Sequence, residues 1–131
     1  MRYLVDTQIL IWTLINPDKL TEQIEQLLQT SEVFVSQISL FEIVIKQKIG
    51  KLPELPLPIK SLEQQIIQDG FNIMPITINH LECYNSVPLL AEHRDPFDRL
   101  LLATAISENM PIISADSNFS YYEPQIMLIK N

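Results

Sequence analysis

Short apolar segments alternate with helix-forming segments along the whole chain, and this alternation limits the fold more than any other feature. The apolar segments are predicted strands at 2–6, 33–36, 71–76 and 111–116, with a last edge strand at 125–129. The helices are expected at 7–16, 21–30, 38–50, 59–70, 77–88 and 95–109. Strands separated by helices need crossover connections, which build parallel sheets. We therefore expect an α/β fold with a central, mostly parallel sheet of four to five strands between two helical layers.

The composition is that of one ordered domain over residues 1–131, with 47% hydrophobic and 19% charged residues. The longest nearly uncharged apolar stretch, 7–16, is too short to cross a bilayer, and Asp6 interrupts the N-terminal apolar segment. We expect neither a membrane span nor a signal peptide. The single cysteine, Cys83, excludes an internal disulfide framework and favours a reducing cytoplasm, where we expect a buried, unreactive thiol.

The charge balance restricts the function without naming it. Nine basic and sixteen acidic residues give a net charge of −7, which argues against a surface that binds nucleic acid by counterion release alone. It leaves room for a site where metal ions meet phosphates, and for a basic protein partner. The chain has two glycines and no Gly-rich phosphate loop, so we expect no nucleotide cofactor.

Two aspartates follow predicted strands. Asp6 ends the first strand and Asp116 ends the strand at 111–116. In open α/β sheets, ligands collect at the carboxyl ends of the strands, so these two side chains are expected to converge. For either residue alone, a turn or a helix cap is an equally simple role.

Glu42 is expected on a helix face that it shares with Ile38, Ile45 and Ile49. Burying an unpaired carboxylate costs several kcal/mol, so the position needs an explanation. A salt bridge, or a different phase of the helix, is the alternative to a functional role.

The segment "HRDPFDRLLLATA" contains two aspartates at the start of a helix. Asp95 before Pro96 is typical of an N-cap residue followed by proline at the first helical position. Asp98 then takes the third helical position, where the helix dipole favours it, but it also lies on the inward face. That face comprises Leu101, Leu102 and Ala105. A cap accounts for Asp95 but only in part for Asp98.

One hypothesis covers all four unexplained acids, which are Asp6, Glu42, Asp98 and Asp116. Clustered carboxylates raise one another's pKa values unless cations lie between them. Hard oxygen ligands suit Mg²⁺ or Mn²⁺, and such a metal can activate water for attack on a phosphodiester.

The chain resembles the PIN-domain ribonucleases, specifically the VapC-type toxins of bacterial toxin–antitoxin pairs. The resemblance is carried, in this order, by "YLVDTQILIWTL", "VSQISLFEIVIKQKIGKL", "HRDPFDRLLLATA" and "PIISADSNF". It implies a PIN-like three-layer α/β/α fold and a catalytic Mg²⁺ or Mn²⁺ site on Asp6, Glu42, Asp98 and Asp116. It also implies supporting roles for Thr7, Ser114 and Ser117. Gln8 departs from the histidine that relatives often carry there, which bears on substrate handling.

The resemblance further implies an endoribonuclease that dimerises and that a cognate antitoxin holds inactive near the acidic pocket. Two other functions stay open. One is a PIN-like binding module that does not cleave RNA. The other is a metal-dependent phosphatase of the haloacid-dehalogenase type, but that family needs Asp-x-Asp after the first strand, and "VDTQ" supplies one acid.

Several basic residues near the acids are candidates for contact with RNA phosphates, namely Lys46, Lys48, Arg94 and Arg99. For the two lysines, and for Lys51 beside them, favourable charge at a helix end is the alternative. Trp12 is expected in the core or in a dimer contact. His80 and His93 lack zinc-ligand spacing with Cys83 or with each other, so no zinc site is expected.

Overall fold

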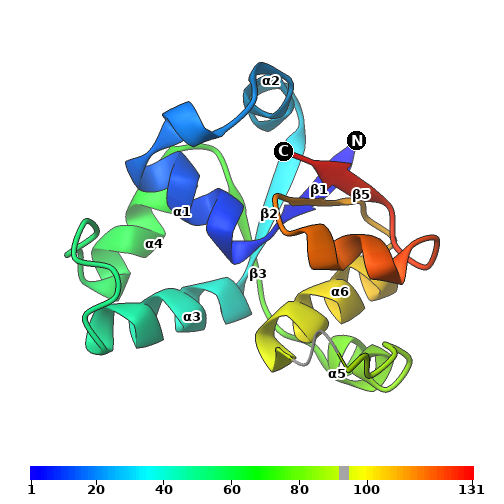
Figure 1. Cartoon of the computed structure of the whole chain (residues 1–131). Coiled ribbons are helices and arrows are strands. Elements are labelled where there is room, and N and C mark those ends of the chain that lie inside the picture. The colour runs from blue at the N-terminus through cyan, green and yellow to red at the C-terminus, as the bar shows by residue number, and fades with distance from the viewer. Residues whose placement is uncertain (92–94) are drawn as a thin grey trace.

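A computed structural model, which describes residues 1–91 and 95–131, has a single five-stranded sheet at its centre (Figure 1). The strands lie in the order β3-β2-β1-β4-β5, and every neighbouring pair is parallel. Their bounds are β1 (Arg2–Val5), β2 (Glu32–Ser36), β3 (Asn72–Met74), β4 (Ile112–Ser114) and β5 (Leu128–Lys130). The predicted parallel α/β sheet is confirmed.

In these two described ranges, six α-helices form where the periodicity predicts them, and two 3₁₀ helices were not expected. The α-helices are α1 (Thr7–Ile15), α2 (Glu22–Thr30), α3 (Gln37–Lys48), α4 (Ile59–Gln68), α5 (Ile78–Tyr84) and α6 (Pro96–Glu108). The 3₁₀ helices are η1 (Pro17–Lys19) and η2 (Ser117–Tyr122). The expected caps Thr77 and Asp95 both accept hydrogen bonds from backbone N–H groups of their helices. The predicted end of α5 at residue 88 is wrong, since the helix stops at Tyr84.

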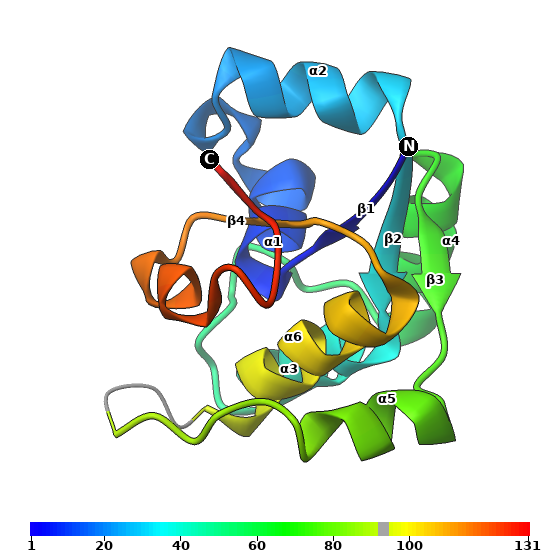
Figure 2. The same ribbon diagram turned by 90° about the vertical axis from the view of Figure 1, so that its right-hand side faces the viewer.

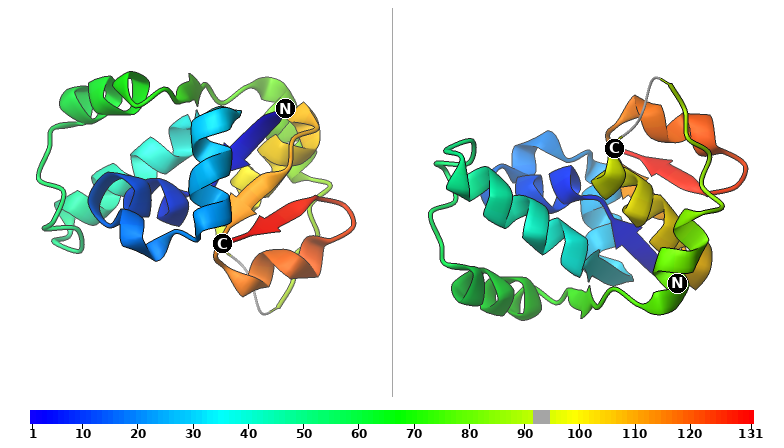
Figure 3. Two further views of the ribbon diagram at one scale, coloured as in Figure 1. Left: turned by 90° about the horizontal axis from the view of Figure 1, so that it is seen from above. Right: turned by 90° about the horizontal axis from the view of Figure 1, so that it is seen from below.

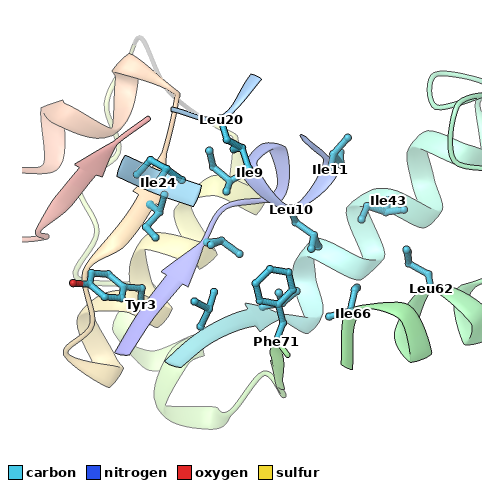
Figure 4. Close-up of a cluster of buried hydrophobic side chains, with 14 of the residues drawn as sticks. Tyr3, Ile9, Leu10, Ile11, Leu20, Ile24, Ile43, Leu62, Ile66 and Phe71 are labelled. Atoms are coloured by element: carbon cyan, nitrogen blue, oxygen red, sulfur yellow. The ribbon is translucent and has the colours of Figure 1, made fainter. Parts of the chain in front are cut away.

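The helices cover both faces of the sheet because successive strand residues point to opposite sides. Val5 and Val35 belong to one hydrophobic cluster. The same cluster contains Leu10 of α1, Ile43 of α3 and Leu62 of α4 (Figure 4). Leu4 points the other way, into a second cluster with Leu101 of α6 and Phe119 of η2. Figure 1 shows α1 and α4 on one side of the sheet and α5 and α6 on the other, as the three-layer prediction requires.

Parallel pairing brings the ends of the central strands into register. Val5 of β1 lies opposite Val35 of β2 and Ile113 of β4, so the residues that follow these strands emerge side by side. The N- and C-termini both lie near α2 (Figure 2). Seen from below, α3 and α6 flank the end of β1 (Figure 3, right). The sheet thus delivers Asp6 to the point where α3 and α6 meet.

Two sequence expectations about burial are wrong. Ile49, expected on the inward face with Glu42, is 58% exposed because α3 has already ended at Lys48, and the fully buried isoleucine of that helix is Ile43. Cys83 is half-buried on α5 rather than fully enclosed. In the part of the chain that the structure describes, no helix has the length and apolarity needed to span a bilayer.

Candidate functional site

Asp6 is a buried carboxylate held between the two central strands. It follows β1 as the N-cap of α1, and its Oδ1 accepts a hydrogen bond of 2.8 Å from the backbone N–H of Ile9. Its Oδ2 accepts a hydrogen bond from the hydroxyl of Ser114, the last residue of β4. Only 4% of Asp6 is exposed. Asp6 is therefore a helix cap, which was one of the roles that the sequence allowed. The hydrogen bond from β4 also fixes the orientation of its carboxylate.

Burial raises the pKa of Asp6 from its ordinary range to about 7. The negative charges of Asp98 and Asp116 raise this pKa further, while the hydrogen bonds from Ser114 and Ile9 oppose the rise. All three acids are thus electrostatically coupled although they come from three separate parts of the chain. A cation beside Asp6 would favour its ionised form at neutral pH.

Glu42 reaches the same region from the second turn of α3. Its Oε1 lies 2.7 Å from the hydroxyl of Thr7, which lies 2.9 Å from the hydroxyl of Ser39. Burial is the largest cause that raises the pKa of Glu42, and Asp98 raises it further. The hydrogen bond from Thr7 and the charge of Lys46 oppose this rise. Thr7 therefore orients Glu42 through a buried hydroxyl network.

A cavity of about 300 Å³ collects these side chains. It is hereafter the acidic cavity, and its lining residues are Asp6, Thr7, Gln8, Trp12, Glu42, Lys46, Asp95, Asp98, Ala115 and Asp116. All four acids singled out in the sequence line it. Of the hydroxyl residues expected in support, Thr7 lines the cavity and Ser114 contacts Asp6, whereas Ser117 is exposed and is not among the lining residues.

Asp95 is the carboxylate whose place in the cavity the sequence did not predict. Its Oδ1 accepts a hydrogen bond of 2.9 Å from the Phe97 backbone N–H, which is the expected cap. The same side chain lines the acidic cavity, and its charge raises the pKa of Glu42. The predicted cap is confirmed, and the same carboxylate also contributes to the electrostatics of the acidic cavity. The spacing of one helical turn between Asp95 and Asp98 was the available signal.

The donor chemistry of the cavity fits a divalent cation, because carboxylate oxygens dominate its lining and hard ions prefer oxygen ligands. The geometry is looser than that of a closed site. Among residues 1–91 and 95–131, no three His, Cys, Asp or Glu side chains stand close enough to hold one ion together. An ion bound here would be held by one or two carboxylates and would keep several waters, which is the usual coordination of Mg²⁺ in proteins.

The basic residues singled out in the sequence occupy different environments. Lys46 lines the acidic cavity, whereas Lys48 is exposed and not among its lining residues. Arg99 is only 4% exposed. Its Nη2 donates a hydrogen bond of 2.9 Å to the carbonyl of Val87. Its guanidinium lies 4.9 Å from the ring centroid of Tyr84. Arg99 therefore joins α6 to the segment after α5, and the prediction that it contacts RNA is wrong. Arg94 and His93 lie outside the described residues.

Trp12 has a position that the sequence only partly predicts. It packs against the core cluster of α1, as expected, but it is half-buried and also lines the acidic cavity. Gln8, one helical turn earlier, lines the cavity as well. The sequence could have indicated this pair, because residues 8 and 12 share a helix face that begins beside Asp6.

The comparisons with known proteins agree with this architecture. The family model of the PIN domain matches residues 3–123. The fold is similar to that of VapBC2 from Rickettsia felis bound to a promoter DNA fragment, with a TM-score of 0.72, 20% identity, and coverage of 99% of this chain and 98% of that chain. It is also similar to DNA-bound VapBC from Salmonella typhimurium, with a TM-score of 0.71, 16% identity and the same coverage.

A third similar structure is VapBC-1 from nontypeable Haemophilus influenzae, with a TM-score of 0.68, 20% identity, and coverage of 99% of this chain and 98% of that chain. No curated protein matches the chain in sequence. At these identities the likeness is one of fold.

Proposed function

The chain belongs to the PIN-domain family, and from this premise we propose that it is a divalent-metal-dependent endoribonuclease and the toxin of a toxin–antitoxin pair. We further propose that residues 1–131 form one PIN domain. The observation that carries the activity is the acidic cavity, where five carboxylates from four separate parts of the chain face one space beside the strand ends. Such a concentration of like charge is costly for folding alone and useful for binding a cation.

In this proposal Asp6, Glu42, Asp98 and Asp116 hold one or more Mg²⁺ or Mn²⁺ ions, directly or through water. The bound ion would supply Lewis-acid stabilisation of the phosphodiester and a nucleophilic water at neutral pH. The chain supplies the orientation of its own ligands. Ser114 and the N–H of Ile9 fix both oxygens of Asp6, and Thr7 fixes one oxygen of Glu42.

The proposed partners are an RNA substrate, a cognate antitoxin and a second copy of the chain. The similar structures are described as VapBC complexes or toxin–antitoxin complexes, which supports the antitoxin. For the dimer, the support is an aromatic pair at the surface. Phe41 of α3 is 54% exposed and its ring lies 5.9 Å from that of Phe97 of α6. Phe97 is half-buried, so Phe41 supplies the exposed part of the pair, and aromatic residues are enriched at protein interfaces.

The test of the nuclease is cleavage of single-stranded RNA by the purified chain with Mg²⁺ or Mn²⁺. We expect Asp98→Asn to reduce the cleavage rate by a factor of at least about 100. Losses of about this size are typical when one group of a metal site or one catalytic side chain is removed. Glu63→Gln, which neutralises an exposed carboxylate outside the cavity lining, is the matched control and should cleave normally. Undiminished cleavage by Asp98→Asn would discard the mechanism.

A second candidate is a PIN-like module that binds partners without cleaving RNA. The spread of the carboxylates favours it, since within the described ranges no three of them stand close enough to share an ion. Calorimetric titration with Mn²⁺ separates the two functions. The nuclease predicts binding that Asp6→Asn or Asp98→Asn weakens, whereas the module predicts no binding through these side chains.

A further inference from the structure

We propose that a second groove, next to the acidic cavity, binds an unpaired nucleobase of the RNA by stacking it on Trp12. This inference rests on the proposed function and names the part of the substrate that the site recognises. The groove, hereafter the Trp12 groove, has a volume of about 410 Å³. Its lining residues are Gln8, Ile11, Trp12, Ile15, Asn16, Lys46, Lys51, Leu52 and Glu54.

The Trp12 groove and the acidic cavity adjoin each other. Gln8, Trp12 and Lys46 line both. Gln8 and Trp12 lie one turn apart on α1, and Lys46 lies one turn after Glu42 on α3. A nucleic acid strand whose phosphate is at the carboxylates would therefore place a nearby nucleotide at Trp12.

The charged side chains that line the Trp12 groove are two lysines and one glutamate, so their net charge is opposite in sign to that of the whole chain. A third lysine lies over the Trp12 ring. Lys46 and Lys51 line the groove, and the Nζ of Lys19 lies 5.9 Å from the centroid of the Trp12 ring. On a chain with a net charge of −7, this cluster is a local attractor for the phosphates that flank a bound base.

Trp12 has the properties of a stacking platform. It packs against the core cluster and is half-buried rather than enclosed, and the ammonium of Lys19 lies over its ring. A stacked base would take the place of this ammonium on the ring. Aromatic stacking accepts every base and is the common way in which proteins bind unpaired nucleotides.

Polar side chains around the ring provide a preference among bases. The amides of Gln8 and Asn16 can donate or accept, whereas the carboxylate of Glu54 can only accept when ionised. Glu54 is therefore expected to favour a base with an exocyclic amino group, as carboxylates do when they accept from the amino group of cytosine. Uracil carries no such group and should bind less tightly than cytosine.

The binding test uses the intrinsic fluorescence of Trp12, which is the only tryptophan in the chain. Six-nucleotide oligo(C) and oligo(U) RNAs are titrated into the full chain carrying Asp6→Asn, so that the RNA stays intact. We expect the RNA to change the fluorescence saturably, with oligo(C) binding more tightly than oligo(U). Glu54→Gln should reduce this difference between the two RNAs.

Affinity and kinetics test the same groove without the fluorophore. With end-labelled RNA, Trp12→Ala should weaken binding about 5- to 150-fold, the range that loss of one stacked base gives. Lys51→Ala should weaken binding less and reduce the slope of log K against log salt by about 0.7. Lys60→Ala, an exposed lysine of α4 outside both cavities, is the matched control. In otherwise unchanged chains, Trp12→Ala and Lys51→Ala should raise KM.

Trp12→Ala also removes core packing, so its thermal melting is recorded and Lys51→Ala, at an exposed position, serves as the second variant. If the chain cleaves RNA through its acids but both variants bind normally and the fluorescence is unchanged, the groove inference is wrong and the proposed function stands. If RNA binds at Trp12 but is not cleaved, the groove inference stands and the nuclease is wrong. A fluorescence response to a partner protein but not to RNA would also overturn the inference.

Discussion

Ionisation of Asp6 should make the metal-free chain less stable as the pH rises. Its pKa is raised by burial to about 7, from an ordinary value near 4. Between these two values the folded chain binds more protons than the unfolded chain, so the free energy of unfolding falls as the pH rises through this window. Each pH unit between the two pKa values is worth about 1.4 kcal/mol, which gives about 4 kcal/mol in total and about 2.5 kcal/mol between pH 5 and pH 8.

Urea unfolding in EDTA at one-unit steps from pH 5 to pH 8 measures this loss directly. The Asp6→Asn chain cannot ionise at this position. Between pH 5 and pH 8 its free energy of unfolding should therefore fall by about 2.5 kcal/mol less than that of the unmodified chain. Glu63→Gln, at an exposed position of α4, should retain the slope of the unmodified chain. Mg²⁺ at about 100 times its Kd should restore about 2.7 kcal/mol at pH 8 to the unmodified chain but not to Asp6→Asn. Equal slopes in the unmodified chain and Asp6→Asn would refute the reasoning.

Three further outcomes test other parts of the structure. Ser114→Ala removes a hydrogen bond that lowers the pKa of Asp6, so the pH–rate profile of RNA cleavage should move to higher pH; an unmoved profile would mean that Asp6 does not limit the rate. Arg99→Ala removes the hydrogen bond to Val87 and the contact with Tyr84, and urea unfolding should show a loss of about 2–4 kcal/mol. Phe41→Glu places a charge in the proposed dimer interface, and analytical ultracentrifugation should then find monomers; a dimer of unchanged Kd would assign the interface elsewhere.

The fold was predictable because its pattern is local. The apolar segments at 2–6, 33–36 and 111–116 each coincide with a strand to within two residues at either end, and parallel crossovers bring their carboxyl ends to one place. For that reason two acids at strand ends, Asp6 and Asp116, could be expected to meet on the evidence of the sequence alone. Glu42 and Asp98 were predictable for a different reason, because their helix faces indicated that a carboxylate would point inward.

The errors come from side chains whose partners are distant in the sequence. Arg99 follows Asp98 directly, and this adjacency suggested a role at the site. The helix turns its side chain away by about 100 degrees per residue, toward Val87 and Tyr84. Trp12 differs from the prediction in the other direction, because its apolar helix face indicated burial and the residue lines a groove. The groove forms because the connector after α3 brings Lys51 and Glu54 next to α1.

The conflict between an acidic chain and an RNA substrate disappears at the scale of the site. The Debye length at physiological ionic strength is about 8 Å, so a bound strand responds to the charges beside it and hardly to the total of −7. At that scale Lys46 faces two environments, since it lines the acidic cavity and the Trp12 groove alike. Its ammonium lowers the pKa of Glu42 on one side and adds to the positive charge around Trp12 on the other. Lys46→Ala should therefore impair both RNA affinity and ionisation of Glu42, whereas Lys51→Ala should impair affinity alone.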